Sequence, residues 1–366
     1  MRASVETVGS LGERALLERI LALLPPAGPE TLGAGDDAAV LPLPDGRAVV
    51  TNDLMVEGPD FLRHWSSPEE TGRKAAVSNL ADLAAMGARP VALVAGLVLP
   101  TATPVVWPCG FARGLAAALA EFAPECRVVG GDLSTGPVLA VSITAIGDLG
   151  GAAPVRRDGA RPGDVLALAG FAGRSAAGLE LLRARVREPA RAAVGPDGLP
   201  SRDGVARLRA ADPGTAACVD QHLAPRAPVD AGPAAGRAGA SAMMDVSDGL
   251  LLDAGRLARS SGLVLDLEPA GLACDVEALA GPLARGLPEL TDGERERLAR
   301  RLVFGGGEDH ALLAAFPPTA PLPEPFRRIG AARACAAGEA PGVLVAGASP
   351  DELGWDPYAP TGSGPR

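Results

Sequence analysis

The stretch that decides the fold is Ala48-Val-Val-Thr-Asn-Asp53, in which β-branched residues lead directly into a carboxylate. Such residues favour β-strands. The same arrangement returns at Val128-Val-Gly-Gly-Asp132 and at Met243-Met-Asp-Val-Ser-Asp-Gly249. In each half of the chain we therefore expect a strand that ends at an acidic turn before a helix. This repetition predicts two related α+β lobes.

Further acidic residues stand beside glycines, at Gly35-Asp-Asp37, at Gly305-Gly-Gly-Glu-Asp309 and at Asp82 on a predicted helix. Carboxylates gathered without histidines suit hard cations such as Mg²⁺. Phosphoryl transfer depends on charge neutralisation more than on a nucleophilic side chain. The pattern predicts a metal-dependent, phosphate-handling enzyme.

The composition narrows the class of protein. A chain of 366 residues with 47% hydrophobic and 21% charged residues is typical of a globular protein of two or three domains. A net charge of -10 argues against a broad nucleic-acid surface. No apolar run reaches the roughly 20 residues that cross a bilayer, and residues 1–8 lack a signal-peptide core. We expect a cytoplasmic protein without a membrane partner.

Apolar periodicity and capping signals predict the elements. Ser67-Pro-Glu-Glu70 is expected to cap a helix that runs to Gly87. The predicted helices cover 10–24, 67–87, 104–123, 175–186 and 249–261, and the predicted strands cover 47–53, 91–99, 127–132, 138–146, 165–169, 241–246, 263–268 and 311–316.

A glycine-rich segment, 147–154, is the predicted boundary between an N-terminal domain (1–150) and a C-terminal domain (151–366). Residues 187–210 have weak periodicity and are predicted to be a surface insertion. No role is assigned to residues 187–240.

Two common enzyme classes are excluded. Lys74 is the one lysine of the chain and follows Arg73, so a Walker A loop, which requires Gly-Lys, is absent. The three histidines stand in no nucleophile or zinc-ligand context. On the helix, Lys74 and Asp82 are two turns apart on one face, and we expect Lys74 to be an electrostatic partner of Asp82.

The motifs together resemble those of the thiamine-monophosphate kinase family and span nearly the whole chain. The segments that carry the resemblance are Gly35-Asp-Asp-Ala-Ala-Val40, Thr51-Asn-Asp53, 73–88, Val129-Gly-Gly-Asp132, Asp245-Val-Ser-Asp-Gly249, Gly306-Gly-Glu-Asp309 and Gly354-Trp-Asp356.

The resemblance implies an α+β, two-lobed fold like that of aminoimidazole ribonucleotide (AIR) synthetase, with a C-terminal α/β lobe. It also implies a homodimer whose N-terminal lobes pair through their sheets. The implied reaction is the last step of thiamine diphosphate biosynthesis. ATP would phosphorylate thiamine monophosphate directly and in line, with several Mg²⁺ ions and no phosphoenzyme.

The resemblance also implies roles for individual residues, with Asp53, Asp132 and Asp248 at the catalytic centre. The implied metal ligands are Asp37, Thr51, Asn52, Asp53, Asp82, Asp132, Asp245 and Asp248. The implied ATP contacts are Gly131, Asp132, Arg157 and Ser247, and the implied thiamine-phosphate contacts are Asp60, Glu308 and Trp355. Trp355 would stack on the cationic ring, and Glu308 would balance its charge.

Three positions depart from the family pattern, one of them being His310, which replaces a common aromatic residue. Asn52 stands where the family usually has Thr, and Asp60 stands where it usually has His. A carboxylate at Asp60 would repel the substrate phosphate unless a cation intervened. Two alternatives therefore stay open: another ATP-using member of the superfamily, such as AIR synthetase, and a non-catalytic binder of nucleotide or thiamine phosphate. Metal-dependent ADP formation would separate an enzyme from a binder.

Overall fold

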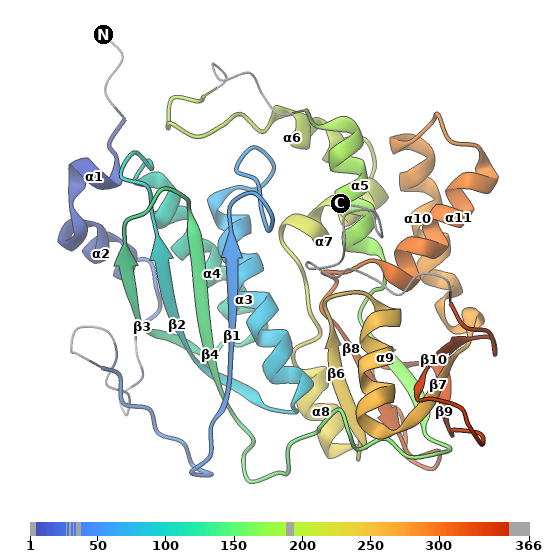
Figure 1. The fold of residues 1–366 in the computed structure, drawn as a ribbon. Helices are drawn as coiled ribbons and strands as arrows, with labels where there is room; N and C mark the ends of the chain where they lie inside the picture. The colour runs from blue at the N-terminus through green and yellow to red at the C-terminus, as the bar shows by residue number, and fades with distance from the viewer. Residues whose placement is uncertain are drawn as a thin grey trace. The chain divides into compact units, whose positions relative to one another are not determined.

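The computed structural model describes residues 5–26, 28, 31, 33, 38–187 and 194–350. The chain forms two compact units. Unit 1 comprises 1–83, 89–151 and 186–207, and unit 2 comprises 84–88, 152–185 and 208–366. Each unit has its own sheet and its own helices (Figure 1). This mixed architecture agrees with the expected α+β class.

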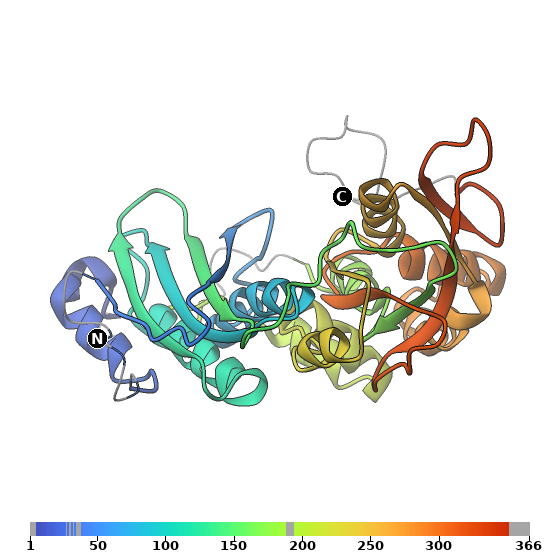
Figure 2. The same ribbon diagram turned by 90° about the horizontal axis from the view of Figure 1, so that it is seen from below.

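Unit 1 is built on a four-stranded sheet with the order β1-β4-β2-β3. β4 is antiparallel to both β1 and β2, and β3 is parallel to β2. Helices α3 and α4 cover one face of this sheet (Figures 1 and 2). The strands are β1 (Val49–Val56), β2 (Arg89–Val98), β3 (Arg127–Ser134) and β4 (Ala140–Asp148).

Apolar side chains between the sheet and these helices form the core of unit 1, including the fully buried Leu80, Leu93, Phe111 and Ile143. The single helix expected over 10–24 is wrong, because Gly12 adopts φ 82° and divides it into two helices. The helices are α1 (Val8–Leu11), α2 (Glu13–Leu21), α3 (Pro68–Ala85) and α4 (Val106–Phe122).

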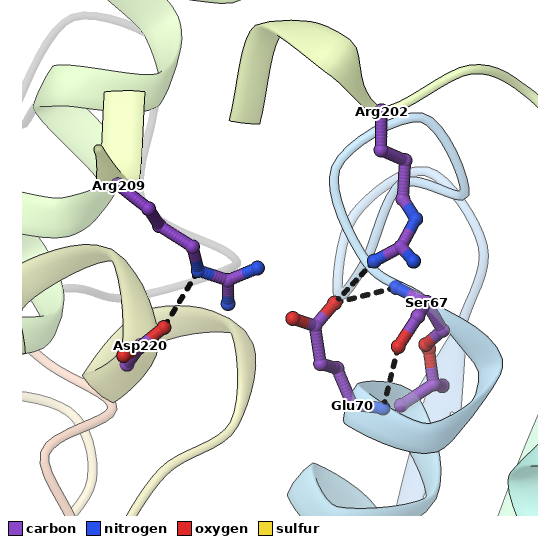
Figure 3. Close-up of polar contacts among 6 residues, drawn as sticks. Ser67, Glu70, Arg202, Arg209 and Asp220 are labelled. Atoms are coloured by element: carbon purple, nitrogen blue, oxygen red, sulfur yellow. Dashed lines mark hydrogen bonds and ion pairs between the residues drawn. The ribbon is translucent and has the colours of Figure 1, made fainter. Parts of the chain in front are cut away.

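The start of α3 has the predicted capping box (Figure 3). The Ser67 hydroxyl accepts the Glu70 N–H at 3.1 Å, and the Glu70 carboxylate accepts the Ser67 N–H at 2.6 Å. Arg202 adds an ion pair with the same carboxylate at 3.0 Å. The segment that begins at residue 194 is therefore anchored to the N-terminus of α3.

The predicted surface insertion at 187–210 is wrong in part. It contains α6 (Asp203–Arg209), in which Val205 and Leu208 are buried. Arg209 at the end of this helix pairs with Asp220 at 2.7 Å (Figure 3). A helix of 7 residues is too short for its apolar residues to produce a clear periodic signal in the sequence.

Unit 2 contains a six-stranded sheet with the order β10-β7-β9-β5-β8-β6. All neighbouring pairs are antiparallel except β10 and β7. The strands are β5 (Val165–Ala169), β6 (Ala242–Val246), β7 (Leu263–Leu267), β8 (Ala311–Phe316), β9 (Arg327–Ala334) and β10 (Gly342–Val345).

In unit 2, α9 connects β6 to β7 and contacts both strands, while α5, α7, α10 and α11 pack on one another. No helix in the described part of the chain is long and apolar enough to cross a membrane. The helices are α5 (Arg174–Arg185), α7 (Pro213–Leu223), α8 (Ala231–Arg237), α9 (Leu250–Ser261), the 3₁₀ turn η1 (Pro269–Leu272), α10 (Ala273–Gly286) and α11 (Asp292–Gly305).

Candidate active site

Three of the predicted site residues meet between β1 and α3. Thr51 Oγ1 donates a hydrogen bond to Asp82 Oδ2 at 2.6 Å. Asp53, two residues along the strand, shares the face of Thr51. Burial, together with the negative charge of Asp82, raises the pKa of Asp53 to about 6. The negative charge of Asp82 thus disfavours ionisation of the Asp53 carboxyl group, in addition to the effect of burial.

The expectation that Asp53 ends its strand is wrong, because β1 continues to Val56 and Asp53 pairs with Ile143. Strand alternation therefore separates neighbouring residues. The Asn52 side chain lies on the opposite face, where its amide donates to Ser142 Oγ at 3.0 Å and to Thr144 Oγ1 at 2.9 Å. The Asn52 side chain does not join the Thr51, Asp53 and Asp82 group.

Asp132 lies inside β3 and is exposed. It pairs with Gly96, which pairs with Ser142, which in turn pairs with Leu54. Residues in one such row share a face of the sheet, so Asp132 lies on the same exposed face of the unit 1 sheet as Leu54. Gly131 is one position earlier, and a Cβ there would come within 2.2 Å of a backbone carbonyl. Within unit 1 the structure does not bring Asp132 to Asp53.

Asp60 closes the turn after β1. Its Oδ2 accepts the Val56 N–H at 2.7 Å, and its backbone carbonyl accepts a hydrogen bond from Lys74 Nζ at 3.1 Å. Lys74 is buried. The lone lysine thus holds the turn that carries Asp60, while its expected pairing with Asp82 stays a prediction. Because the Asp60 carboxylate is bound to the backbone, part of its charge is already compensated.

In unit 2 the two loops that carry predicted motifs pack against each other. The first loop follows β6 at 247–249, and the second spans 305–310, from the last residue of α11 to β8. Ser247 O accepts the Glu308 N–H at 2.7 Å, and Val246 O accepts the His310 N–H at 3.0 Å. A Cβ at Gly249 would come within 2.5 Å of a backbone carbonyl of the second loop, and the residue adopts φ 112°. The glycines of the motif therefore permit close backbone contact. As predicted, Ser247 and Asp248 lie between β6 and α9.

A buried carboxylate that the sequence analysis did not select holds the first loop. Asp253 Oδ2 accepts the N–H groups of Ser247 and Asp248 at 3.1 and 3.0 Å. Arg256 Nη1 then bridges Asp253 Oδ1 at 2.6 Å and Asp248 Oδ2 at 2.5 Å. Burial raises the pKa of Asp253 to about 6, against the lowering effect of these bonds. An acidic residue in the first turn of a predicted helix was the available signal.

The second loop has a strained backbone. Glu308 and His310 adopt φ 63° and 51°, a region that favours glycine. Between them, Asp309 is buried and accepts the N–H groups of Gly173 and Ser175 at 2.6 and 2.8 Å. Its burial raises the pKa of its carboxyl group to about 7. Strain of this kind persists where surrounding contacts determine the conformation, and it is common at functional sites.

The remaining predicted residues that the structure describes are spread over unit 2. Asp245 is buried within β6. The backbone carbonyl of Arg157 accepts a hydrogen bond from Ser261 Oγ at 3.0 Å, at the C-terminal end of α9. Ser247 precedes the opposite end of that helix. Asp37 and Trp355 lie outside the described residues.

The unit 1 group fits part of a magnesium site. Among the described residues, no group of three or more His, Cys, Asp or Glu side chains is arranged to hold a metal ion. The oxygens of Thr51, Asp53 and Asp82 nevertheless form a hard, acidic donor set, which Mg²⁺ prefers. A bound cation would offset the repulsion that raises the pKa of Asp53.

Comparison with known proteins agrees with this fold. Residues 35–149 match the family "AIR synthase related protein, N-terminal domain". This match identifies the N-terminal part of the chain as AIR-synthase-related, as expected from the sequence.

The particular family follows from full-length relatives. The chain is 39% identical to thiamine-monophosphate kinase of Mycobacterium tuberculosis over 325 residues, 88% of this chain and 86% of that protein. It is 41% identical to thiamine-monophosphate kinase of Corynebacterium glutamicum over 327 residues, 88% and 87% of the two chains. The structure of AaThiL complexed with AMPPCP and TMP has 27% identity and a TM-score of 0.65, covering 96% of this chain and 99% of that one. The chain belongs to the thiamine-monophosphate kinase family.

Proposed function

We propose that this protein transfers the γ-phosphoryl group of ATP to thiamine monophosphate and releases ADP and thiamine diphosphate. The observation that carries the proposal is identity of 39% and 41% to two thiamine-monophosphate kinases over most of each chain. The related AaThiL structure with AMPPCP and TMP supports the choice of both substrates. The cytoplasmic location expected from the sequence remains a prediction.

The chain's own groups support a direct transfer. Phosphoryl transfer between two anionic substrates requires positioning and charge neutralisation, and it needs no covalent intermediate on the protein. Bound Mg²⁺ ions would supply that neutralisation. In unit 1, Thr51, Asp53 and Asp82 would hold metal, and in unit 2 Asp245 and Asp248 are the proposed ligands. Asp37, Asn52 and Asp132 stay proposed as ligands through the family resemblance.

The second loop of unit 2 supports recognition of the thiamine cation. The Glu308 side chain is 38% exposed, so a ligand can reach its carboxylate. Its backbone is fixed by the hydrogen bond to Ser247. A negative charge held at this position would attract the positively charged thiazolium ring. We propose that Glu308 balances this ring and that Trp355 stacks on it.

We also propose that the protein is a homodimer paired through the unit 1 sheet. The face of this sheet opposite α3 carries Val50 and Leu54, which are 60% and 63% exposed. Apolar side chains on an open sheet face are typical of an interaction surface. Light scattering of the wild type and of Leu54→Glu tests this point: a dimer that the substitution dissociates is expected, and a wild-type monomer would contradict it.

The kinase proposal is tested by titrating Mg²⁺ while measuring thiamine diphosphate formation. Asp82→Asn should shift the Mg²⁺ requirement upward about tenfold or more, because one anionic ligand is lost. Asp230→Asn is the matched control, since Asp230 precedes α8 and makes no side-chain cap bond. Product formation that is indifferent to Mg²⁺, or equally altered in both variants, would contradict the proposal.

A further inference from the structure

We infer that His222, on α7, is a positioning residue that holds the Glu308 carboxylate in the orientation used for the thiamine cation. The inference rests on the proposed function and deepens it. It assigns a role to a histidine, and to a helix within 187–240, that no motif of the sequence selected.

The contact joins two segments far apart in the chain. His222 Nδ1 lies 3.2 Å from Glu308 Oε2. The same nitrogen lies 3.2 Å from Ser175 Oγ, at the start of α5. A carboxylate only accepts hydrogen bonds, so the contact is a hydrogen bond in the tautomer that carries the proton on Nδ1, a proton that Ser175 Oγ then shares. A hydrogen bond to an ionised group is about twice as strong as one between neutral groups.

The histidine is itself held in place. His222 and Ser175 are both buried, and Ser175 makes a second contact through its N–H to Asp309. The preceding residue, Gln221, donates its side-chain amide to Asp309 O at 3.0 Å. Two consecutive residues of α7 therefore hold two consecutive residues of the strained loop, Glu308 through its side chain and Asp309 through its backbone.

This arrangement matters because the Glu308 side chain is only part-buried. A glutamate has several rotatable bonds, and fixing them when a ligand binds lowers affinity. A buried imidazole that fixes the carboxylate beforehand removes part of that cost. The contact between His222 and Glu308 should therefore affect recognition of the thiamine substrate more than recognition of ATP.

The test compares KM for thiamine monophosphate, KM for ATP and kcat in three single variants and one double variant. His222→Leu removes the donor and should raise KM for thiamine monophosphate about tenfold, with KM for ATP changed less than twofold. His222→Asn places an N–H donor near the position of Nδ1 and should recover most of the loss. Glu308→Gln should raise the same KM, and the double variant with His222→Leu should be no worse than Glu308→Gln alone.

Thr215→Val is the matched control, because Thr215 is buried on the same helix and its hydroxyl bonds to Asp212 instead. It should lower thermal stability while keeping the ratio of the two KM values. A His222→Leu protein that folds with unchanged KM for thiamine monophosphate would overturn the inference but keep the kinase. Additive effects in the double variant would do the same. A wild type that makes no thiamine diphosphate would overturn the proposed function and the inference with it.

Discussion

Replacing Asp253 by alanine should loosen the loop that carries Ser247 and Asp248. The side chain is fully buried, and its Oδ2 accepts both backbone N–H groups of that loop. Leaving two part-buried donors without this acceptor costs up to about 1–3 kcal/mol each. Relief of a carboxyl group whose pKa is already raised to about 6 offsets part of this loss. The expected net loss is about 2–4 kcal/mol.

Hydrogen exchange of the peptide that spans 245–256 measures this loss directly. Since about 1.4 kcal/mol corresponds to a tenfold change, loop amides should exchange roughly 30-fold to 1,000-fold faster in Asp253→Ala. Asp253→Asn keeps one acceptor oxygen and should lie in between. Asp158→Ala is the control, because Asp158 forms an exposed ion pair with Arg156, and such pairs contribute little. Exchange in Asp253→Ala within threefold of the wild type would refute the assigned role.

Three further predictions concern other buried or strained positions. Lys74→Arg should lower kcat/KM about tenfold although the charge is kept. The buried Lys74 ammonium donates to Asp60 O, and a guanidinium is larger and planar. Wild-type kinetics in this variant would contradict the prediction. Folding raises the pKa of Asp309 to about 7, so protonated Asp309 favours the folded state. This contribution to the free energy of unfolding is complete below about pH 4 and is lost as the pH rises through about 7. Urea unfolding at several pH values should show the free energy of unfolding falling over this range in the wild type and not in Asp309→Asn. Gly249→Ala should lower the free energy of unfolding by about 2 kcal/mol or more, and Gly262→Ala by about 1 kcal/mol. Both glycines have positive φ, but only at Gly249 would the new Cβ clash with a backbone carbonyl. Equal losses of stability in thermal denaturation would contradict this prediction.

The sequence predicted strands and helix ends well where a short run of residues determines them. The apolar runs at 165–169 and 311–316 matched β5 and β8 at both ends, and the Ser67 capping box formed as expected. The Asp-Val-Ser-Asp-Gly and Gly-Gly-Glu-Asp motifs, both selected from the sequence, lie side by side in the structure. They meet because β6 and β8 are adjacent and antiparallel, with Val246 opposite Ala311.

The sequence could not give the parts of the site that depend on strand register or on distant contacts. The family resemblance grouped Asn52 and Asp132 with Asp53 as metal ligands, whereas pairing inside longer strands places both on the other face of the unit 1 sheet. Their role as ligands stays a prediction. The contact between His222 and Glu308 was not predictable from the sequence, since α5, α7 and the strained loop come together only in the folded unit. Asp212 before Pro213 was an unused helix-start signal for α7, and Asp212 does cap that helix.

The most direct test of the central claim is a comparison of acceptors. ADP release and thiamine diphosphate formation are measured with ATP and Mg²⁺ in the presence of thiamine monophosphate, thiamine or no acceptor. The account predicts equal amounts of ADP and thiamine diphosphate with the monophosphate, and neither product above background with the other two. ATP binding without product, or equal ADP release under all three conditions, would contradict it.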